Sequence, residues 1–237
     1  MSYVRLPLFL TPQEAAMRLL RYGTALLALL TAVSLLIATP AVAAGPTVRG
    51  GDRVYSSSGG SCAIGFNAHG GGTQRYGLLP GGCGGTGTTW YADSALTVPI
   101  GTTAASSFPG GGWALIQYNA TVNAPGEISI GGAGYPITGA ASPVVGGRVC
   151  LATPTSGTRC GTVTAVNLTI NAGSGAYTGV FAANLCVEAG TAPGTPSFSG
   201  SAGVGVLIGS SGNCATGGTS YHLPVVQALN SFGLSLA

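Results

Sequence analysis

Short runs of β-branched and aromatic residues, bounded by glycine and proline, recur along this chain of 237 residues. Runs of this kind lie at 113–118, 148–151, 162–170 and 203–208. The run at 162–170 alternates small or polar residues with Val, Leu or Ile, which is the period of a half-buried strand. Short strands at this spacing predict a sandwich or a barrel. A helical pattern lies at 224–232, between Pro224 and Gly233, residues that suit the first turn and the end of a helix.

The composition excludes several classes of protein. Charged residues make up 5% of the chain and hydrophobic residues 46%, which is the reverse of a disordered chain, and there is no collagen period or heptad repeat. The basic side chains are all arginine, and the formal net charge is +3. Beyond residue 44, five arginines face four acidic residues, so the net charge there is near +1. Such a surface has no basic patch for a nucleic-acid backbone, and we expect no nucleic-acid partner.

The first 44 residues have the organisation of a secretory signal peptide. Arg18 and Arg21 precede an apolar run from about residue 24 to 38, and small residues follow. We therefore expect a signal peptide at 1–44, with Met17 as an alternative start, and a secreted domain at 45–237 that begins without a propeptide. The apolar run is shorter than the ~20 residues that a membrane span needs. A retained anchor is thus the weaker alternative, and we expect no stable span after cleavage.

Six cysteines lie beyond this leader, and an even number of cysteines in a secreted chain predicts a disulfide framework. They are Cys62, Cys83, Cys150, Cys160, Cys186 and Cys214. Spacing alone leaves all fifteen pairings open. The sequence has no Cys-x-x-Cys and only two histidines, so we expect no metal site and no cofactor.

Several segments, in order along the chain, resemble a known family. The segments at 50–58 and 62–67 look like the mature N-terminus of that family, and Cys186-Val-Glu188 matches a later motif. Further matches lie at 88–94, 101–103, 106–109, 149–165 and 211–214. Together with the terminal helix they resemble the secreted actinobacterial chymotrypsin-like peptidases, in the streptogrisin and α-lytic protease branch. The resemblance covers essentially all of 45–237.

This resemblance implies an all-β fold of two packed, antiparallel, six-stranded β-barrels with a short C-terminal helix. The barrels would lie at approximately 45–120 and 121–237. The resemblance also implies the disulfides Cys62–Cys83, Cys150–Cys160 and Cys186–Cys214. Each would close a loop of about 10–30 residues, and one bridge of that length contributes roughly 3 kcal/mol to stability.

The catalytic positions of the family carry no catalytic residue in this chain. A serine peptidase of this kind needs a nucleophilic serine, a histidine that takes its proton and an aspartate that orients the histidine. Gly82, directly before Cys83, matches the histidine, and Gly112, after a Ser-Ser-Phe-Pro run, matches the aspartate. Ala192, which follows the Cys186 motif, matches the serine. All three functional groups are therefore expected to be missing.

Other parts of the machinery also depart from the family. The backbone N–H groups of Gly190 and Ala192 would form the oxyanion hole. Pro193 follows directly, and its fixed φ would reshape that turn. The wall of the primary specificity pocket, which is Thr-Ser-Gly-Gly in the family, matches Leu207, Ile208 and Gly209 here.

We expect no other residues to replace the triad. His69 lies in a glycine-rich segment that is a hairpin tip in the family, and His222 precedes the terminal helix, so we interpret both as structural. Ser197, Ser199 and Ser201 follow the lost nucleophile, but no base is placed beside them. The few acidic residues do not suggest a paired-carboxylate mechanism.

Our hypothesis from the sequence is a secreted, disulfide-stabilised, catalytically inactive homologue of the trypsin-like serine endopeptidases, with a binding or structural role. We expect a monomer whose partner is a peptide, a protein or an envelope component. Trp90, Tyr91 and Trp113 are candidates for an exposed binding face, with packing inside the barrels as the alternative. Two other hypotheses stay open. One is an active secreted serine endopeptidase with an unrecognised nucleophile, and the other is a decaying paralogue with no function of its own.

Overall fold

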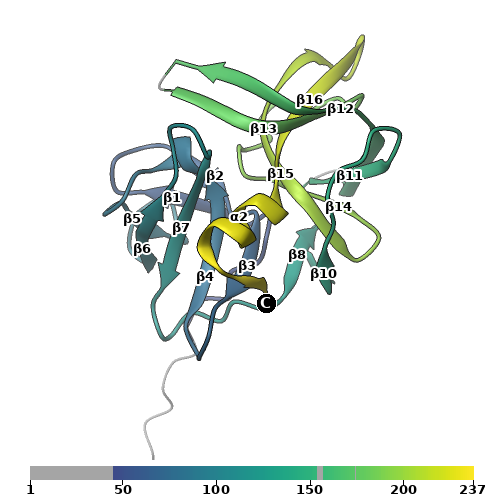
Figure 1. The fold of residues 1–237 in the computed structure, drawn as a ribbon. Helices are drawn as coiled ribbons and strands as arrows, with labels where there is room; N and C mark the ends of the chain where they lie inside the picture. The colour runs from purple at the N-terminus through teal and green to yellow at the C-terminus, as the bar shows by residue number, and fades with distance from the viewer. Residues whose placement is uncertain (1–44, 154–156, 174) are drawn as a thin grey trace, which may run out of the picture. The chain divides into compact units, whose positions relative to one another are not determined.

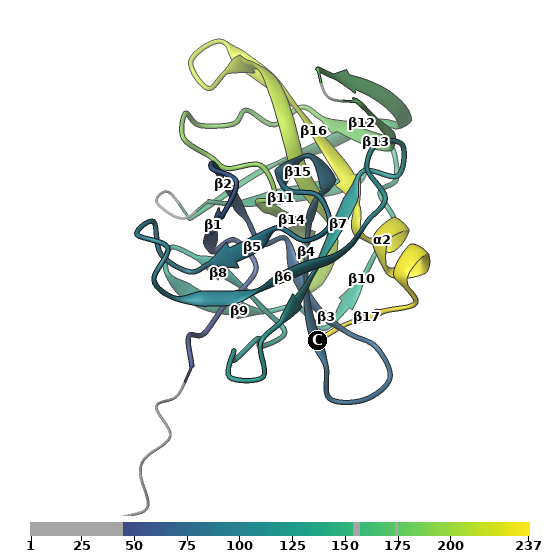
Figure 2. The same cartoon turned by 90° about the vertical axis from the view of Figure 1, so that its left-hand side faces the viewer.

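The structure is a computed structural model that describes residues 45–153, 157–173 and 175–237. The predicted signal peptide at 1–44, including Met17, lies outside these residues. The described residues belong to one compact unit, Ala44–Ala237. Their regular secondary structure is mostly β-strand, with one short α-helix near the C-terminus (Figures 1 and 2).

The first sheet is a barrel built from residues 53–118. Its strands are β1 (Arg53–Ser56), β2 (Ser61–Ala63), β3 (Phe66–His69), β4 (Arg75–Pro80), β5 (Thr89–Tyr91), β6 (Pro99–Ser106) and β7 (Trp113–Tyr118). Pairing runs from β2 through β1, β5, β6, β7 and β4 to β3. Because β2 and β3 are consecutive parts of one stretch, 61–69, the sheet closes on itself. With that stretch counted as one strand, the unit has the six strands that we predicted (Figure 1).

The second sheet is also a closed barrel. Its strands are β11 (Arg148–Thr153), β12 (Gly157–Ala172), β13 (Gly175–Ala183), β14 (Pro196–Ser199), β15 (Ala202–Asn213) and β16 (Gly217–Pro224). Pairing runs β15-β14-β11-β12-β13-β16, and a further β15–β16 pairing completes the ring. A short strand, β10 (Gly139–Ala140), adds to the outside of β15 in parallel. The six-stranded barrel is confirmed for this half as well.

Two features change the approximate division of the chain near residue 120. The C-terminal strand β17 (Ser235–Leu236) pairs with β3, so the end of the chain belongs to the first sheet. The segment after β7 forms a separate hairpin of β8 (Glu127–Ile130) and β9 (Ala133–Pro136). We expected the whole C-terminal part to belong to the second barrel, whereas its last strand, β17, pairs with β3 of the first sheet.

The terminal helix α2 spans Val225–Phe232, as the sequence pattern predicts. Pro224 is its N-cap, where the missing N–H is not needed by the helix. Gly233 ends the helix in the left-handed conformation, with φ 64° and ψ 41°, and its N–H donates to the carbonyl of Leu229. Val225 and Ala228 are buried, so the helix packs against the barrels through one face.

The buried side chains form three clusters. One lies inside the first barrel and contains Trp90 and Ile116, and a second lies inside the second barrel and contains Phe181 and Leu207. The third draws from both sheets, and its members include Phe66, Leu78, Trp113, Tyr177, Val180, Val206, Leu223 and Val225. This shared core packs the two barrels against each other along their common face.

Burial decides the role of two of the candidate binding aromatics. Trp90 and Trp113 are both 0% exposed, so they pack in the cores and cannot form an exposed binding face. The Trp90 indole N–H donates to the hydroxyl of Thr103 at 2.8 Å. Tyr91 alone of the three is partly exposed. The packing alternative therefore holds for both tryptophans.

The structure has three disulfides, Cys62–Cys83, Cys150–Cys160 and Cys186–Cys214, which is the pairing that the resemblance implies. Cys150 and Cys160 are direct partners across β11 and β12. None of the helices in the described part of the chain has the length and apolar character needed to cross a membrane.

Candidate functional site

Two of the expected triad positions, Gly82 and Gly112, lie side by side at one end of the first barrel. Gly82 is in a short 3-10 turn, Gly81–Cys83, that follows β4 directly. Gly112 precedes β7, and β4 and β7 are antiparallel partners with Pro80 opposite Trp113. The Gly81 N–H donates to the Gly112 carbonyl at 2.7 Å. Strand pairing thus brings these positions together although they are distant in the sequence.

The third position, Ala192, lies in the loop between β13 and β14 of the second barrel. Its carbonyl accepts hydrogen bonds from the Thr195 hydroxyl at 2.7 Å and from the Thr195 N–H at 3.2 Å. The next carbonyl along, that of Pro193, accepts from the Ala63 N–H at 2.7 Å. Ala63 follows Cys62, which is bonded to Cys83, the neighbour of Gly82. A short covalent and hydrogen-bonded path therefore joins the Ala192 loop to the turn that carries Gly82.

A tyrosine that sequence reasoning missed fills the space beside Gly82 and Gly112. A Cβ placed on Gly82 would lie 2.3 Å from the Tyr177 hydroxyl oxygen. A Cβ placed on Gly112 would lie 2.8 Å from Cδ1 of the same ring and 2.9 Å from Cδ2 of Leu223. Tyr177 is only 8% exposed. Side chains at positions 82 and 112 would therefore compete with the Tyr177 ring for the same volume.

Burial and the Gly82 backbone both act on the Tyr177 hydroxyl. Burial raises the pKa of Tyr177, and a hydrogen bond with the Gly82 backbone opposes that shift. The hydroxyl therefore stays protonated and neutral at ordinary pH. The sequence signal that could have suggested this tyrosine is the pair of glycines itself, because two absent side chains leave room for a large neighbour.

Two hydrogen bonds shape the segment 188–192, which we align with the oxyanion loop of the family, one from outside the segment and one within it. The Arg53 guanidinium donates to the Gly190 carbonyl at 2.7 Å, and the Thr191 N–H donates to the Glu188 carbonyl at 3.2 Å. Within the described residues, the N–H groups of Gly190 and Ala192 make no hydrogen bond. Two free backbone donors are what an oxyanion hole requires, but the methyl group of Ala192 offers no nucleophile beside them.

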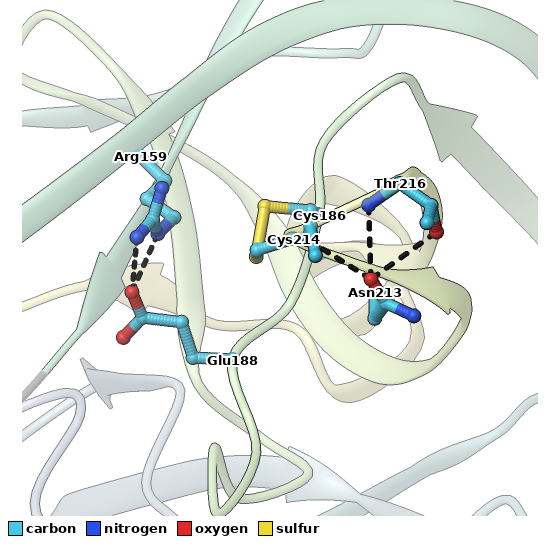
Figure 3. Close-up of a disulfide and its surroundings, with 7 residues drawn as sticks. Arg159, Cys186, Glu188, Asn213, Cys214 and Thr216 are labelled. Atoms are coloured by element: carbon cyan, nitrogen blue, oxygen red, sulfur yellow. Dashed lines mark hydrogen bonds and ion pairs between the residues drawn. A yellow bond between two sulfur atoms is a disulfide. The ribbon is translucent and has the colours of Figure 1, made fainter.

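A disulfide and an ion pair fix the start of this segment (Figure 3). Cys186 is bonded to Cys214 at the tip of the β15–β16 hairpin. In that tip the Asn213 carboxamide oxygen accepts hydrogen bonds from the backbone N–H and the hydroxyl of Thr216. The Glu188 carboxylate accepts from Nε of Arg159 at 2.8 Å. The loop before Ala192 is therefore tethered to strand β12 and to the turn of the β15–β16 hairpin.

A cavity of about 490 Å³ lies beside the same segment. Its lining residues are Gly51, Asp52, Arg53, Ser129, Gly132, the segment 188–192 and Thr195. Burial raises the pKa of the Asp52 carboxyl, although the Arg49 backbone N–H donates to it at 2.7 Å. Gly82, Gly112 and the expected pocket wall do not line this cavity. It is thus a hollow next to the oxyanion segment and separate from the other two triad positions.

The expected pocket wall lies on β15. Leu207 is 2% exposed and packs in the core of the second barrel, while Ile208 is half-buried against the shared core. Gly209 follows a register shift between β15 and β16. The branched side chains of this strand therefore serve as core residues.

The two histidines occupy very different positions. His69 ends β3 next to the loop of the β3–β4 hairpin, where it pairs with Arg75, and its Nδ1 contacts the Gly70 carbonyl. His222 is 0% exposed, directly across from Leu207, and its Nε2 lies 2.8 Å from the hydroxyl oxygen of Ser220. Burial lowers the pKa of His222 to about 3. Although a serine contacts this histidine, both side chains are fully enclosed, so a substrate cannot reach the pair.

The structure offers no evident site for a metal ion. Among the described residues, no three His, Cys, Asp or Glu side chains come close enough together to hold one. All six cysteines are in disulfides.

Comparison with known proteins places the chain among bacterial serine proteases. No family model matches it. It is 38% identical over 175 residues to Serine protease 2 of Streptomyces fradiae, which covers 73% of this chain and 100% of that protein. It is 35% identical over 190 residues to Streptogrisin-C of Streptomyces griseus, which covers 80% of this chain but only 41% of that longer protein.

A solved structure, the alpha-lytic protease homolog N4, shares 48% sequence identity with this chain at a TM-score of 0.73. The match covers 80% of this chain and 98% of the other. The two closed barrels, the terminal helix and these identities agree, and the chain belongs to the streptogrisin and α-lytic protease branch of the chymotrypsin-like serine peptidases.

Proposed function

We propose that this protein is a secreted, non-catalytic member of its family that keeps the two-barrel scaffold for a binding or structural role. The observation that carries the proposal is the state of the triad positions. Gly82 and Gly112 have no side chain, Ala192 has only a methyl group, and Tyr177 fills the volume beside the two glycines. Secretion is supported by the signal-like leader and by the three disulfides.

The absence of a nucleophile and of an accessible base supports the proposal that the protein does not hydrolyse peptides. Attack on a peptide carbonyl requires a nucleophile whose proton a nearby base accepts, and the base in turn must be held in orientation. Ala192 cannot act as a nucleophile. His69 pairs with Arg75 at the start of β4, whereas Gly82 follows the end of that strand, and His222 is enclosed with a pKa of about 3. Neither histidine lines the cavity beside Ala192, so neither can act as a base there.

The groups that remain beside Ala192 and could act on a substrate are backbone N–H groups. The free N–H groups of Gly190 and Ala192 could polarise a carbonyl oxygen, but complete loss of a serine-peptidase triad lowers kcat by about a millionfold. The residual rate enhancement from an oxyanion hole and binding alone is about 10³–10⁴ over water. Such a rate is far below that of a working peptidase.

The test is turnover by the secreted protein with its three disulfides verified by mass. Casein and a library of peptide substrates would be assayed with the natural protein and with an Ala192→Ser variant, alongside an active streptogrisin as the positive control. We expect no saturable hydrolysis from either form, because the single change restores neither the base nor the orienting acid. Saturable hydrolysis that copurifies with the natural protein would refute the proposal and favour an unrecognised nucleophile.

A further inference from the structure

The β12–β13 hairpin of the second barrel makes direct backbone contacts with the loop of the first barrel that precedes β7. The Gly110 N–H donates to the Ala176 carbonyl at 3.0 Å, and the Gly110 carbonyl accepts from the Thr178 hydroxyl. Gly110 and Tyr177 form an isolated parallel bridge between the two segments. The hairpin is labelled β12 and β13 in Figure 1. These contacts through Ala176 and Thr178 position the backbone of Tyr177 next to the loop that precedes β7.

The Tyr177 ring is held firmly in that place. It packs against Phe108, with ring centroids 4.9 Å apart and planes inclined at 38°. The positions that a Cβ would take on Gly112 and on Gly82 are 2.8 Å from its Cδ1 and 2.3 Å from its hydroxyl oxygen. One edge and the tip of the ring thus lie against the two glycines, and the ring packs on Phe108.

The hydroxyl of Tyr177 is the specific obstacle at position 82. Next after that oxygen, a Cβ on Gly82 would meet only Cζ of the same ring, at the ordinary contact distance of 3.5 Å. Gly82 is not among the residues with positive φ, so its backbone would accept an alanine without strain. The need for glycine at this position therefore comes from the tyrosine hydroxyl rather than from the turn.

We infer that Tyr177 is an internal plug: it occupies the volume of the family's catalytic histidine and aspartate and turns the former triad into a packing junction between the barrels. Gly82 and Tyr177 then form a coupled pair. Gly112 lies against the same ring, but its positive φ of 87° and its approach to Leu223 favour glycine there independently of Tyr177. The cavity beside Ala192 and the segment 188–192 is not lined by Tyr177 and stays open. The inference uses the proposed function only to interpret positions 82 and 112 as former triad positions.

A double-mutant cycle tests the coupling. Gly82→Ala, Tyr177→Phe and the double variant would be made in the full chain, with Gly85→Ala as the matched control. Gly85 lies in the same loop, has no positive φ and has nothing within 4 Å of a Cβ. Urea unfolding would give the ratio of folded to unfolded protein for each variant.

We expect Gly82→Ala to lower that ratio at least tenfold when Tyr177 is present, and to change it less than threefold in the Tyr177→Phe background. Gly85→Ala is expected to be nearly neutral. If Gly82→Ala fails to fold, folding of the double variant supports the plug. Equal effects of Gly82→Ala in the two backgrounds, or a double variant that fails to fold while Tyr177→Phe folds, would overturn it. Since no step measures hydrolysis, detection of peptidase activity would refute the proposed function without deciding this cycle.

Discussion

Acidification is expected to destabilise the protein through His222. Its ring is fully buried and stacks on Phe181, with centroids 4.8 Å apart. Burial lowers its pKa from the ordinary 6.5 to about 3. Between these two values the unfolded chain binds a proton that the folded chain does not, so the free energy of unfolding falls as the pH falls. The contribution is fully present above pH about 6.5 and is lost progressively below it.

The magnitude follows from the unfolded state. Each pH unit below a pKa of about 6.5 favours the protonated, unfolded imidazole by about 1.4 kcal/mol. Between pH 7 and about pH 4.5 the loss of stability through His222 should therefore be about 2.5 kcal/mol. This value does not depend on the exact folded pKa, provided that it lies well below 4.5.

Urea unfolding at several pH values would measure this loss in the natural protein and in His222→Gln, with His222→Phe as a second variant next to Phe181. The difference between natural protein and variant isolates His222, because carboxyl groups such as Asp52 are common to both. Asp52 itself acts with the opposite sign, since burial raises its pKa and its contribution is lost as the pH rises through that value. The same pH dependence in the natural protein and both variants would refute the reasoning and mean that His222 titrates freely in the fold.

Three further predictions concern stability. Removal of the Cys186–Cys214 bridge by paired changes to alanine should lower the free energy of unfolding by about 3–4 kcal/mol, because the bridge closes a separation of 28 residues. A loss below about 1 kcal/mol in urea unfolding would contradict this prediction. Arg159→Gln should lower it by less than about 1 kcal/mol, because the Arg159 and Glu188 side chains are 41% and 28% exposed, and a salt-independent loss of several kcal/mol would oppose that view. Ile116→Val should lower the free energy of unfolding by about 1 kcal/mol, because Ile116 is 0% exposed. Val144→Ala should have almost no effect, because Val144 is 67% exposed. Equal effects of the two changes would contradict the assignment of Ile116 to the core.

Local chemistry made some elements predictable. The helix at Val225–Phe232 follows from its apolar spacing, its leading Pro224 and its closing Gly233, all of which act within a few residues. The barrel strands were recognisable as a class from their β-branched runs, but their pairing order came from the family resemblance. Period-two alternation cannot say which strand lies next to which.

Contacts between distant segments were not predictable. Strand β17 has two residues, too few to show a period, and it forms only because the end of α2 delivers it to β3. The site of Tyr177 depends on the hairpin that carries it and on the loop at Gly110, which meet only in the folded chain. The sequence could show that side chains were missing at 82 and 112, but which residue occupies their place is a property of the packed barrels.

An active-site probe would show directly whether this protein carries a working serine nucleophile, which we propose it lacks. The natural secreted protein would be incubated with a fluorophosphonate and analysed by intact mass and peptide mapping, with an active streptogrisin as the positive control. We predict complete labelling of the control and no stoichiometric adduct on this protein, because Ala192, the residue that we align with the family's serine, carries only a methyl group. A stoichiometric adduct on a single residue would contradict the claim, and the mapped position would identify the nucleophile.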